Sequence, residues 1–226
     1  MIRFINKNFY KIVFLISILV SCFNAIIGFK YVTIWYDEIF SLAMIKLPVD
    51  MMITELVNDV HPILYYLILR FFVSLFSLFG FKNIIALGVF VSLLPICLLL
   101  IFNYFVIKKT YGEKVMAWFS LFLVAMPLML RYSNEIRMYS WAIFFVTLVF
   151  FYLKKILDDR TNWKDWIIIT IAAIVNIYSL FCCCINGFMY LLFLIYILVK
   201  NRSLIKKYIL STFVIICGFL PCYLIF

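Results

Sequence analysis

Long apolar runs separated by short polar clusters make up this chain from end to end. Seven runs are long enough to be membrane-spanning helices, because about 20 apolar residues cross the ~30 Å hydrocarbon core as a helix. They cover residues 10–29, 84–107, 115–130, 138–153, 166–182, 185–199 and 208–226. The runs lack the alternation of apolar and polar residues that marks the strands of a membrane barrel. The pattern therefore predicts an all-α protein, a polytopic bundle of transmembrane helices.

An eighth apolar run, residues 62–80, carries Arg70 in its middle. An arginine at the bilayer centre costs about 2.5–3.5 kcal/mol on the insertion scale. Cytoplasmic loops are also rich in Lys and Arg. If the N-terminus is cytoplasmic and residues 62–80 do not span, fourteen of the 20 Lys and Arg residues lie on the cytoplasmic side. If residues 62–80 did span, the later clusters of Lys and Arg would lie on the outer side instead. We therefore predict an interfacial helix in the extracytoplasmic first loop, with Arg70 reaching the headgroups.

Composition agrees with a location in the membrane. The chain is 68% hydrophobic with a mean hydropathy of +1.17, whereas soluble domains are about 45–50% apolar. The net charge of +10 follows from the positive-inside rule. It does not indicate a nucleic-acid partner, because no soluble domain is present to carry a basic patch.

Other features of the chain bear on its organisation. All seven cysteines lie in apolar runs without CxxC spacing, so we expect neither disulfides nor metal binding by cysteine. The first run resembles an uncleaved signal anchor. No repeat or linker interrupts the chain, which we read as one domain, residues 1–226. The last run ends without a polar flank, so we expect the sequence to be truncated at its C-terminus.

Polar residues that can do chemistry gather on the predicted outer side. Six of the ten acidic residues lie there, within three clusters or near them. The clusters are Trp35-Tyr36-Asp37-Glu38, Asn58-Asp59-Val60-His61-Pro62 and Tyr132-Ser133-Asn134-Glu135-Ile136-Arg137-Met138-Tyr139. Neighbouring carboxylates suit general-base or metal chemistry, and an arginine at a span boundary can hold a phosphate. Each cluster alone also fits a plain alternative, namely a solvated loop, a helix cap or an interface anchor.

In order and spacing, the three clusters together resemble a family. It is the family of C-type glycosyltransferases that contains the protein O-mannosyltransferases and aminoarabinose transferases. The residues that carry the resemblance are Asp37-Glu38 in the first loop, Asp59-Val60-His61-Pro62-Ile63-Leu64-Tyr65-Tyr66, and Tyr132 to Tyr139. The resemblance covers most of the chain. It departs from the family in two places, because Ile63 stands where a second proline is usual and residues 178–182 lack a histidine that many members have.

The resemblance implies a transferase that uses a polyprenyl-phosphate sugar at the outer face of the cell membrane. Asp37 would be the catalytic base, supported by Glu38. The donor or acceptor would be bound by a further set of residues: Asp59, His61, Glu135, Arg137 and Tyr139. Arg137 would bind the lipid phosphate, where a cation offsets the growing negative charge. The resemblance implies no certain cofactor, and it leaves open a divalent cation held by Asp59 and His61. The donor sugar and the acceptor (protein, lipid or polysaccharide) also stay open.

Two other classes of function remain as alternatives. A transporter or flippase for a polar lipid needs ionisable residues near the middle of its spans. The predicted spans offer only Asn24, Asn103 and Asn176 as strong polar groups. An inactive or fragmentary relative of the transferases is the other alternative. A transferase accounts for the outer clusters best.

Overall fold

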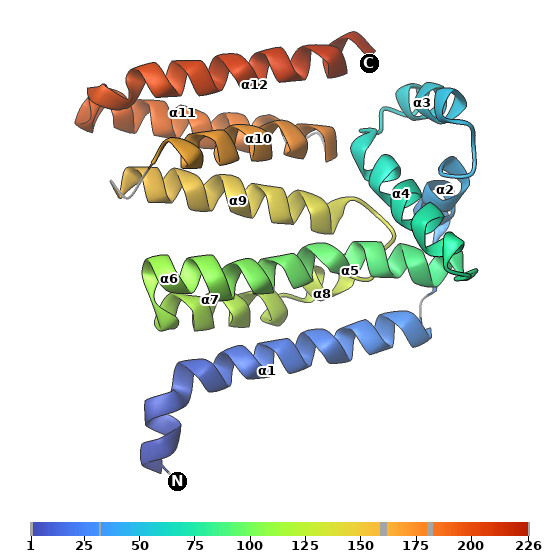
Figure 1. The fold of residues 1–226 in the computed structure, drawn as a ribbon, viewed down its shortest axis with the longest axis horizontal. Coiled ribbons are helices and arrows are strands. Elements are labelled where there is room, and N and C mark those ends of the chain that lie inside the picture. The colour runs from blue at the N-terminus through green and yellow to red at the C-terminus, as the bar shows by residue number, and fades with distance from the viewer. Residues whose placement is uncertain (1, 32, 159–161, 180–182, 226) are drawn as a thin grey trace. The chain divides into compact units, whose positions relative to one another are not determined.

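The computed structural model describes residues 2–31, 33–158, 162–179 and 183–225 (Figure 1). Every regular element in these ranges is helical, which confirms the all-α prediction for the described residues. The elements are α1 (Ile2–Tyr31), α2 (Tyr36–Met44), α3 (Val49–Asn58), α4 (Leu64–Leu78), α5 (Ile84–Phe102), the π-helix η1 (Asn103–Ile107), α6 (Lys108–Tyr111), α7 (Glu113–Ala125), α8 (Pro127–Tyr132), α9 (Tyr139–Leu157), α10 (Trp163–Ser179), α11 (Cys183–Lys200), the 3₁₀-helix η2 (Arg202–Leu204) and α12 (Ile205–Ile225).

Four of the described helical segments are long and apolar enough to cross a membrane. They are Asn8–Lys30, Ile84–Tyr111, Tyr139–Leu157 and Arg202–Pro221. Helices also occupy the other three predicted spans, but α7 and α10 have only 13 and 17 residues, and the apolar part of α11 is shorter than the four segments. Residues 180–182 of the fifth predicted span and residue 226 of the last lie outside the described residues. The four segments indicate a membrane protein, and the seven-span arrangement stays a prediction.

The predicted helix over residues 115–130 is interrupted. α7 ends at Ala125, Met126 is extended with φ −83° and ψ 114°, and α8 begins at Pro127. Proline disfavours the helical conformation of the residue before it, which explains the break at Met126. The short α8 then delivers the chain to the polar segment 133–138, the loop between α8 and α9.

By its internal contacts, the chain divides into two compact units. The first contains Met1–Ala43 and Ile68–Ser140, and the second contains Met44–Leu67 and Trp141–Phe226. The single module predicted over residues 1–226 stays a prediction.

In the first unit, α1 packs against α7 and α5. A polar contact joins α5 to α7 at the π-helix, where the fully buried Asn103 side chain donates to the Met116 carbonyl at 2.9 Å and to Ser120 Oγ at 2.6 Å. Buried amides that bond across helices hold such helices together in apolar surroundings. Asn103 therefore has a structural role.

In the second unit, α10 packs against α12, and α11 against α12 (Figure 1). Polar contacts fix the ends of these helices. Lys155 of α9 forms an ion pair with the buried Asp165 of α10 at 2.7 Å, and Asp165 also accepts from the Asn162 amide in a reciprocal cap of the helix start. Tyr196 of α11 donates to the Leu157 carbonyl at 3.1 Å.

The apolar segment 62–80 forms α4, which has 15 residues. At about 1.5 Å per residue this helix is about 22 Å long, shorter than the ~30 Å hydrocarbon core. It is among the shorter apolar helices rather than the four candidate spans. Its length agrees with the non-spanning interpretation, while its place at the outer interface stays a prediction.

Candidate functional site

The loop between α8 and α9 packs closely against two glycines of the first unit. A Cβ on Gly28 of α1 would come within 2.3 Å of the Asn134 side chain, and a Cβ on Gly88 of α5 would come within 2.8 Å of Ile136. Ile136 is fully buried. Any larger residue at either glycine would therefore force the Asn134 or Ile136 side chain to shift, in the loop that carries Glu135 and Arg137.

Asn24 of α1 fixes the same loop by hydrogen bonds. Its side-chain amide donates to the Leu130 carbonyl at 3.0 Å and to Ser133 Oγ at 2.9 Å. In return, the Asn134 amide donates to the Asn24 carbonyl at 3.2 Å. The loop is thus held to α1 by polar contacts on both sides of Ser133.

Glu38 ties the loop to the start of α2. Its side chain is buried, with only 2% exposed. One carboxylate oxygen accepts from the Trp35 amide at 3.1 Å, as in a capping box. The other accepts from the Ile136 amide at 2.7 Å, 98 residues away. These bonds support a positioning role for Glu38, which holds its neighbour Asp37 against the loop; the predicted support of catalysis stays a prediction.

Replacing Glu38 with Ala is expected to lower the free energy of unfolding by about 1–3 kcal/mol, because the buried Ile136 amide and the partly buried Trp35 amide lose their acceptor. Thermal unfolding of the purified protein in detergent measures this loss. Glu55 is an exposed residue of α3, and Glu55→Ala is the matched control, expected within about 0.5 kcal/mol of the wild type. Equal midpoints for both variants would show that Glu38 does not hold the loop.

Asp37 and Arg137 lie together at the entrance of α2. Arg137 Nη2 is 3.7 Å from Asp37 Oδ2, and Nη1 donates to the Asp37 carbonyl at 3.3 Å. The arginine side chain is 5% exposed, whereas the aspartate side chain is 36% exposed. Arg137 also lies over the Tyr139 ring at 5.9 Å. The Asp37 carboxylate is therefore partly exposed to solvent, while the Arg137 guanidinium beside it is buried. The two residues come from two of the three predicted clusters.

Glu135, on the same loop, faces a polar cavity. Arg131 Nε donates to its carboxylate at 2.5 Å, and this hydrogen bond raises the pKa of Arg131. Both residues line a cavity of about 380 Å³ together with Ile27, Gly28, Thr33, Trp35, Glu38 and Asn134. Arg131, with 63% of its side chain exposed, therefore adds a cation to the lining of this cavity.

An apolar cavity of about 400 Å³ borders the same stretch of chain. Its walls come from α1, α5, α7 and α8, and they include Phe29, Phe90, Leu100 and Leu130. Asn24 and Ser133 contribute to its lining. Residues 129–135 therefore take part in two cavities, one polar and one apolar.

The middle cluster belongs to the second unit. His61 Nδ1 lies 3.0 Å from Asp59 Oδ2 and 2.8 Å from the Asp59 carbonyl. The turn before it closes α3 with bonds from the amides of Val60 and His61 to the carbonyls of Val57 and Leu56, the pattern of a Schellman cap. Val60 has a φ of 55°, a strained value for a β-branched residue. The strained turn sets the side chains of Asp59 and His61 against each other.

The possible divalent cation stays untested. Among the residues that the structure describes, no three His, Cys, Asp or Glu side chains gather closely enough to hold a metal ion. Asp59 and His61 are two donors of suitable type, at 3.0 Å from each other.

The structure thus brings Asp37, Glu38, Glu135, Arg137 and Tyr139 together within the first unit, and Asp59 with His61 within the second. Sequence reasoning did not select four further residues that shape the first group: Asn24, Gly28, Arg131 and Asn134. The sequence did hint at Arg131, because it precedes Glu135 by four residues, a spacing that suits an ion pair on a helix. It also hinted at Asn24, which is the strong polar group of the first apolar run.

Comparison of the chain with protein-family models, with curated proteins and with solved structures gave no match. The resemblance to C-type glycosyltransferases therefore rests on the three motifs and stays a hypothesis.

Proposed function

We propose that this protein is a membrane glycosyltransferase that moves a sugar from a polyprenyl-phosphate donor to an acceptor on the extracytoplasmic face. The observation that carries the proposal is the pair of Asp37 and Arg137. Two motifs that are 100 residues apart meet there, and they join a half-exposed carboxylate to a buried guanidinium. A base for the acceptor and a cation for the leaving phosphate are the two groups that such a transfer needs.

Each residue has a defined part in the proposed reaction. Asp37 takes the proton of the acceptor hydroxyl as the acceptor oxygen forms its bond to the anomeric carbon. The bond from that carbon to the phosphate oxygen breaks on the opposite face, so the configuration inverts. The electron pair of that bond goes to the phosphate, whose charge Arg137 offsets. Tyr139 supports the guanidinium through its ring.

The two cavities beside residues 129–135 suit an amphiphilic donor. Their volumes of about 380 and 400 Å³ fall within the usual range of about 300–1,000 Å³ for ligand sites. The polar cavity, with Arg131, Glu135 and Asn134, is suited to a sugar. The apolar cavity is suited to isoprene units close to the phosphate.

The proposal includes a multi-pass topology in the plasma or inner membrane, with the N-terminus in the cytoplasm. The distribution of Lys and Arg supports it, as do the four long apolar helices. The active site then faces outward, where polyprenyl-phosphate sugars and extracytoplasmic acceptors meet.

A transporter fits the structure less well. The strong polar groups of the predicted spans make contacts within the protein: Asn24 binds the loop, Asn103 binds Ser120, and Asn176 donates to Asn186 at 3.3 Å. Such contacts hold helices together, which gives these side chains a structural role.

Sugar transfer by membranes that contain the protein tests the proposal. Membranes supplied with a labelled polyprenyl-phosphate sugar are expected to move label into a protein, lipid or polysaccharide fraction, and matched membranes lacking the protein are the control. Mannose, aminoarabinose and other hexose or pentose donors are compared. No transfer from any of these lipid donors, with the protein shown to be folded, would favour a transporter or an inactive relative.

A further inference from the structure

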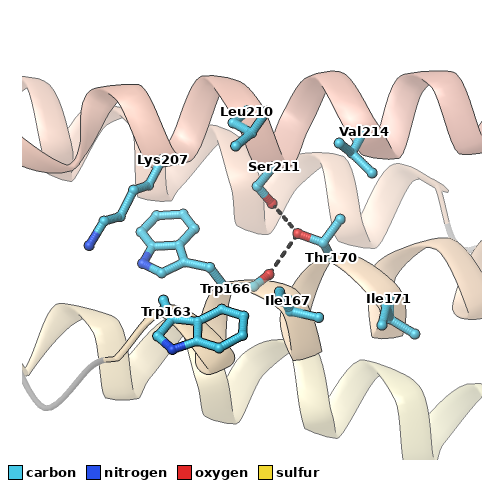
Figure 2. Close-up of a pocket in the computed structure, with 9 residues that line it drawn as sticks. All are labelled: Trp163, Trp166, Ile167, Thr170, Ile171, Lys207, Leu210, Ser211 and Val214. Carbon is cyan, nitrogen blue, oxygen red and sulfur yellow. Dashed lines mark hydrogen bonds between the residues drawn. The ribbon is translucent and has the colours of Figure 1, made fainter.

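In the second unit, a groove lies between the first halves of α10 and α12 (Figure 2). Its volume is about 400 Å³. The lining residues are Trp163, Trp166, Ile167, Thr170, Ile171, Lys207, Leu210, Ser211 and Val214. Neither the proposed transfer reaction nor its candidate residues involve this groove.

Most of the groove wall is hydrocarbon. Ile167 and Ile171 lie one turn apart on α10, and Leu210 and Val214 lie one turn apart on α12, so each pair shares a helix face. The hydroxyl groups between them are already bonded: Thr170 Oγ1 donates to the Trp166 carbonyl at 2.7 Å and lies 2.7 Å from Ser211 Oγ. The wall therefore offers hydrophobic contact and suits an acyl chain.

One end of the groove is cationic and aromatic. Lys207 lies in the first turn of α12, and Trp163 and Trp166 lie in the first turn of α10. Figure 2 shows the Trp166 indole between the side chains of Lys207 and Trp163. Trp166 is 7% exposed, and its buried Nε1 has no hydrogen-bond partner among the described residues. An indole N–H that is buried usually finds an acceptor, so this donor is available for one.

Lys207 is not the sole source of positive charge among the described residues at this end of the groove. Lys164 and Lys206 are exposed in the same two helical turns. The acidic residue nearest in sequence, Asp165, is already paired with Lys155. Lys207 makes no ion pair with any residue that the structure describes. The starts of two helices add further positive potential at the same end. This end therefore favours an anion.

We propose that the groove binds an anionic phospholipid of the surrounding membrane. One acyl chain lies along Ile167, Ile171, Leu210 and Val214, and the lipid phosphate accepts hydrogen bonds from Lys207 Nζ and from Trp166 Nε1. Tryptophan and lysine are residues that proteins place at the level of lipid headgroups, and basic pockets between membrane helices bind anionic headgroups.

The experiment counts lipid adducts on the purified protein by native mass spectrometry. Phosphatidylglycerol and phosphatidylcholine with identical acyl chains are added together, and the wild type is expected to retain phosphatidylglycerol preferentially. Lys207→Gln is expected to lower this retention about fivefold, the effect of one basic residue on binding to an anionic lipid. Lys200→Gln, at the exposed end of α11 outside the groove, removes the same charge and is expected to leave retention unchanged.

A second variant tests the apolar part separately. Leu210 is 65% exposed, so Leu210→Trp can fill the groove without entering the core. Circular dichroism checks that each variant is folded, and Leu210→Trp is expected to reduce retained phosphatidylglycerol as strongly as Lys207→Gln.

Three results would overturn the proposal. Equal retention of the two lipids would mean that the groove does not select an anion. Equal losses from Lys207→Gln and Lys200→Gln would mean that only the overall surface charge matters. A dimer that Leu210→Trp dissociates, with lipid retention unchanged, would assign the groove to a second copy of the chain.

Discussion

Replacing Asp37 with Asn is expected to lower sugar transfer by about 10²–10⁴-fold, the usual contribution of a positioned general base. The substitution keeps the size of the side chain and removes its basicity. The contacts that position residue 37 come from elsewhere, namely the Arg137 bond to its carbonyl and the two bonds of Glu38. The variant is therefore expected to fold and to bind its donor normally. Transfer of labelled sugar from a polyprenyl phosphate, with donor binding measured in parallel, gives the result.

Asp50→Asn is the matched control for this prediction, because Asp50 is an exposed aspartate in the first turn of another short helix, α3. It is expected to retain full activity. Glu38 cannot replace Asp37 as the base, since both of its carboxylate oxygens already accept hydrogen bonds from backbone amides. Near-normal turnover of Asp37→Asn, together with loss of turnover in Asp59→Asn or Glu38→Gln, would assign the base to another carboxylate.

The helices of this protein were predictable because long apolar runs carry a strong signal. The break at Met126 was missed, although Pro127 stands in the sequence, because the run from 115 to 130 is apolar throughout. Hydrophobicity alone does not distinguish one span from a shorter helix followed by a turn. The local backbone rule for the residue before proline decided the outcome.

The sequence predicted which residues belong to the candidate site better than it predicted the contacts between them. Charge placement put Asp37 and Arg137 on one predicted side of the membrane, but nothing in their spacing showed that they touch. Their contact depends on how closely the loop approaches α1 and α5, which the missing side chains of Gly28 and Gly88 permit. Close approach of a side chain to a glycine on another helix is a property of three-dimensional packing and leaves little trace in one sequence.

Glu38 illustrates the same limit in another way. Beside Asp37 it reads as half of a carboxylate pair, and the sequence offers no sign that its carboxylate accepts a hydrogen bond from the Ile136 amide, 98 residues away. Its place three residues after Trp35 did carry a local signal, since glutamate at the third helical position often bonds back to the cap residue.

Arg137→Gln is expected to weaken binding of a polyprenyl-phosphate sugar about tenfold or more, because a hydrogen bond to a charged group contributes roughly 1.5–3 kcal/mol. Equilibrium binding of a labelled donor to the purified protein measures the change. Arg70→Gln removes an arginine outside the site, in the apolar α4, and is expected to have a much smaller effect.

The geometry of Arg137 makes a double variant informative. Because Arg137 contacts both the carbonyl and the carboxylate of Asp37, Arg137→Gln alters turnover in two ways, through the phosphate and through the position of the base. Donor binding separates them, since Asp37→Asn is expected to leave it unchanged. In the double variant, donor binding should then equal that of Arg137→Gln alone. If Arg137→Gln lowers turnover but leaves donor binding unchanged, the arginine positions Asp37 and the lipid phosphate binds elsewhere.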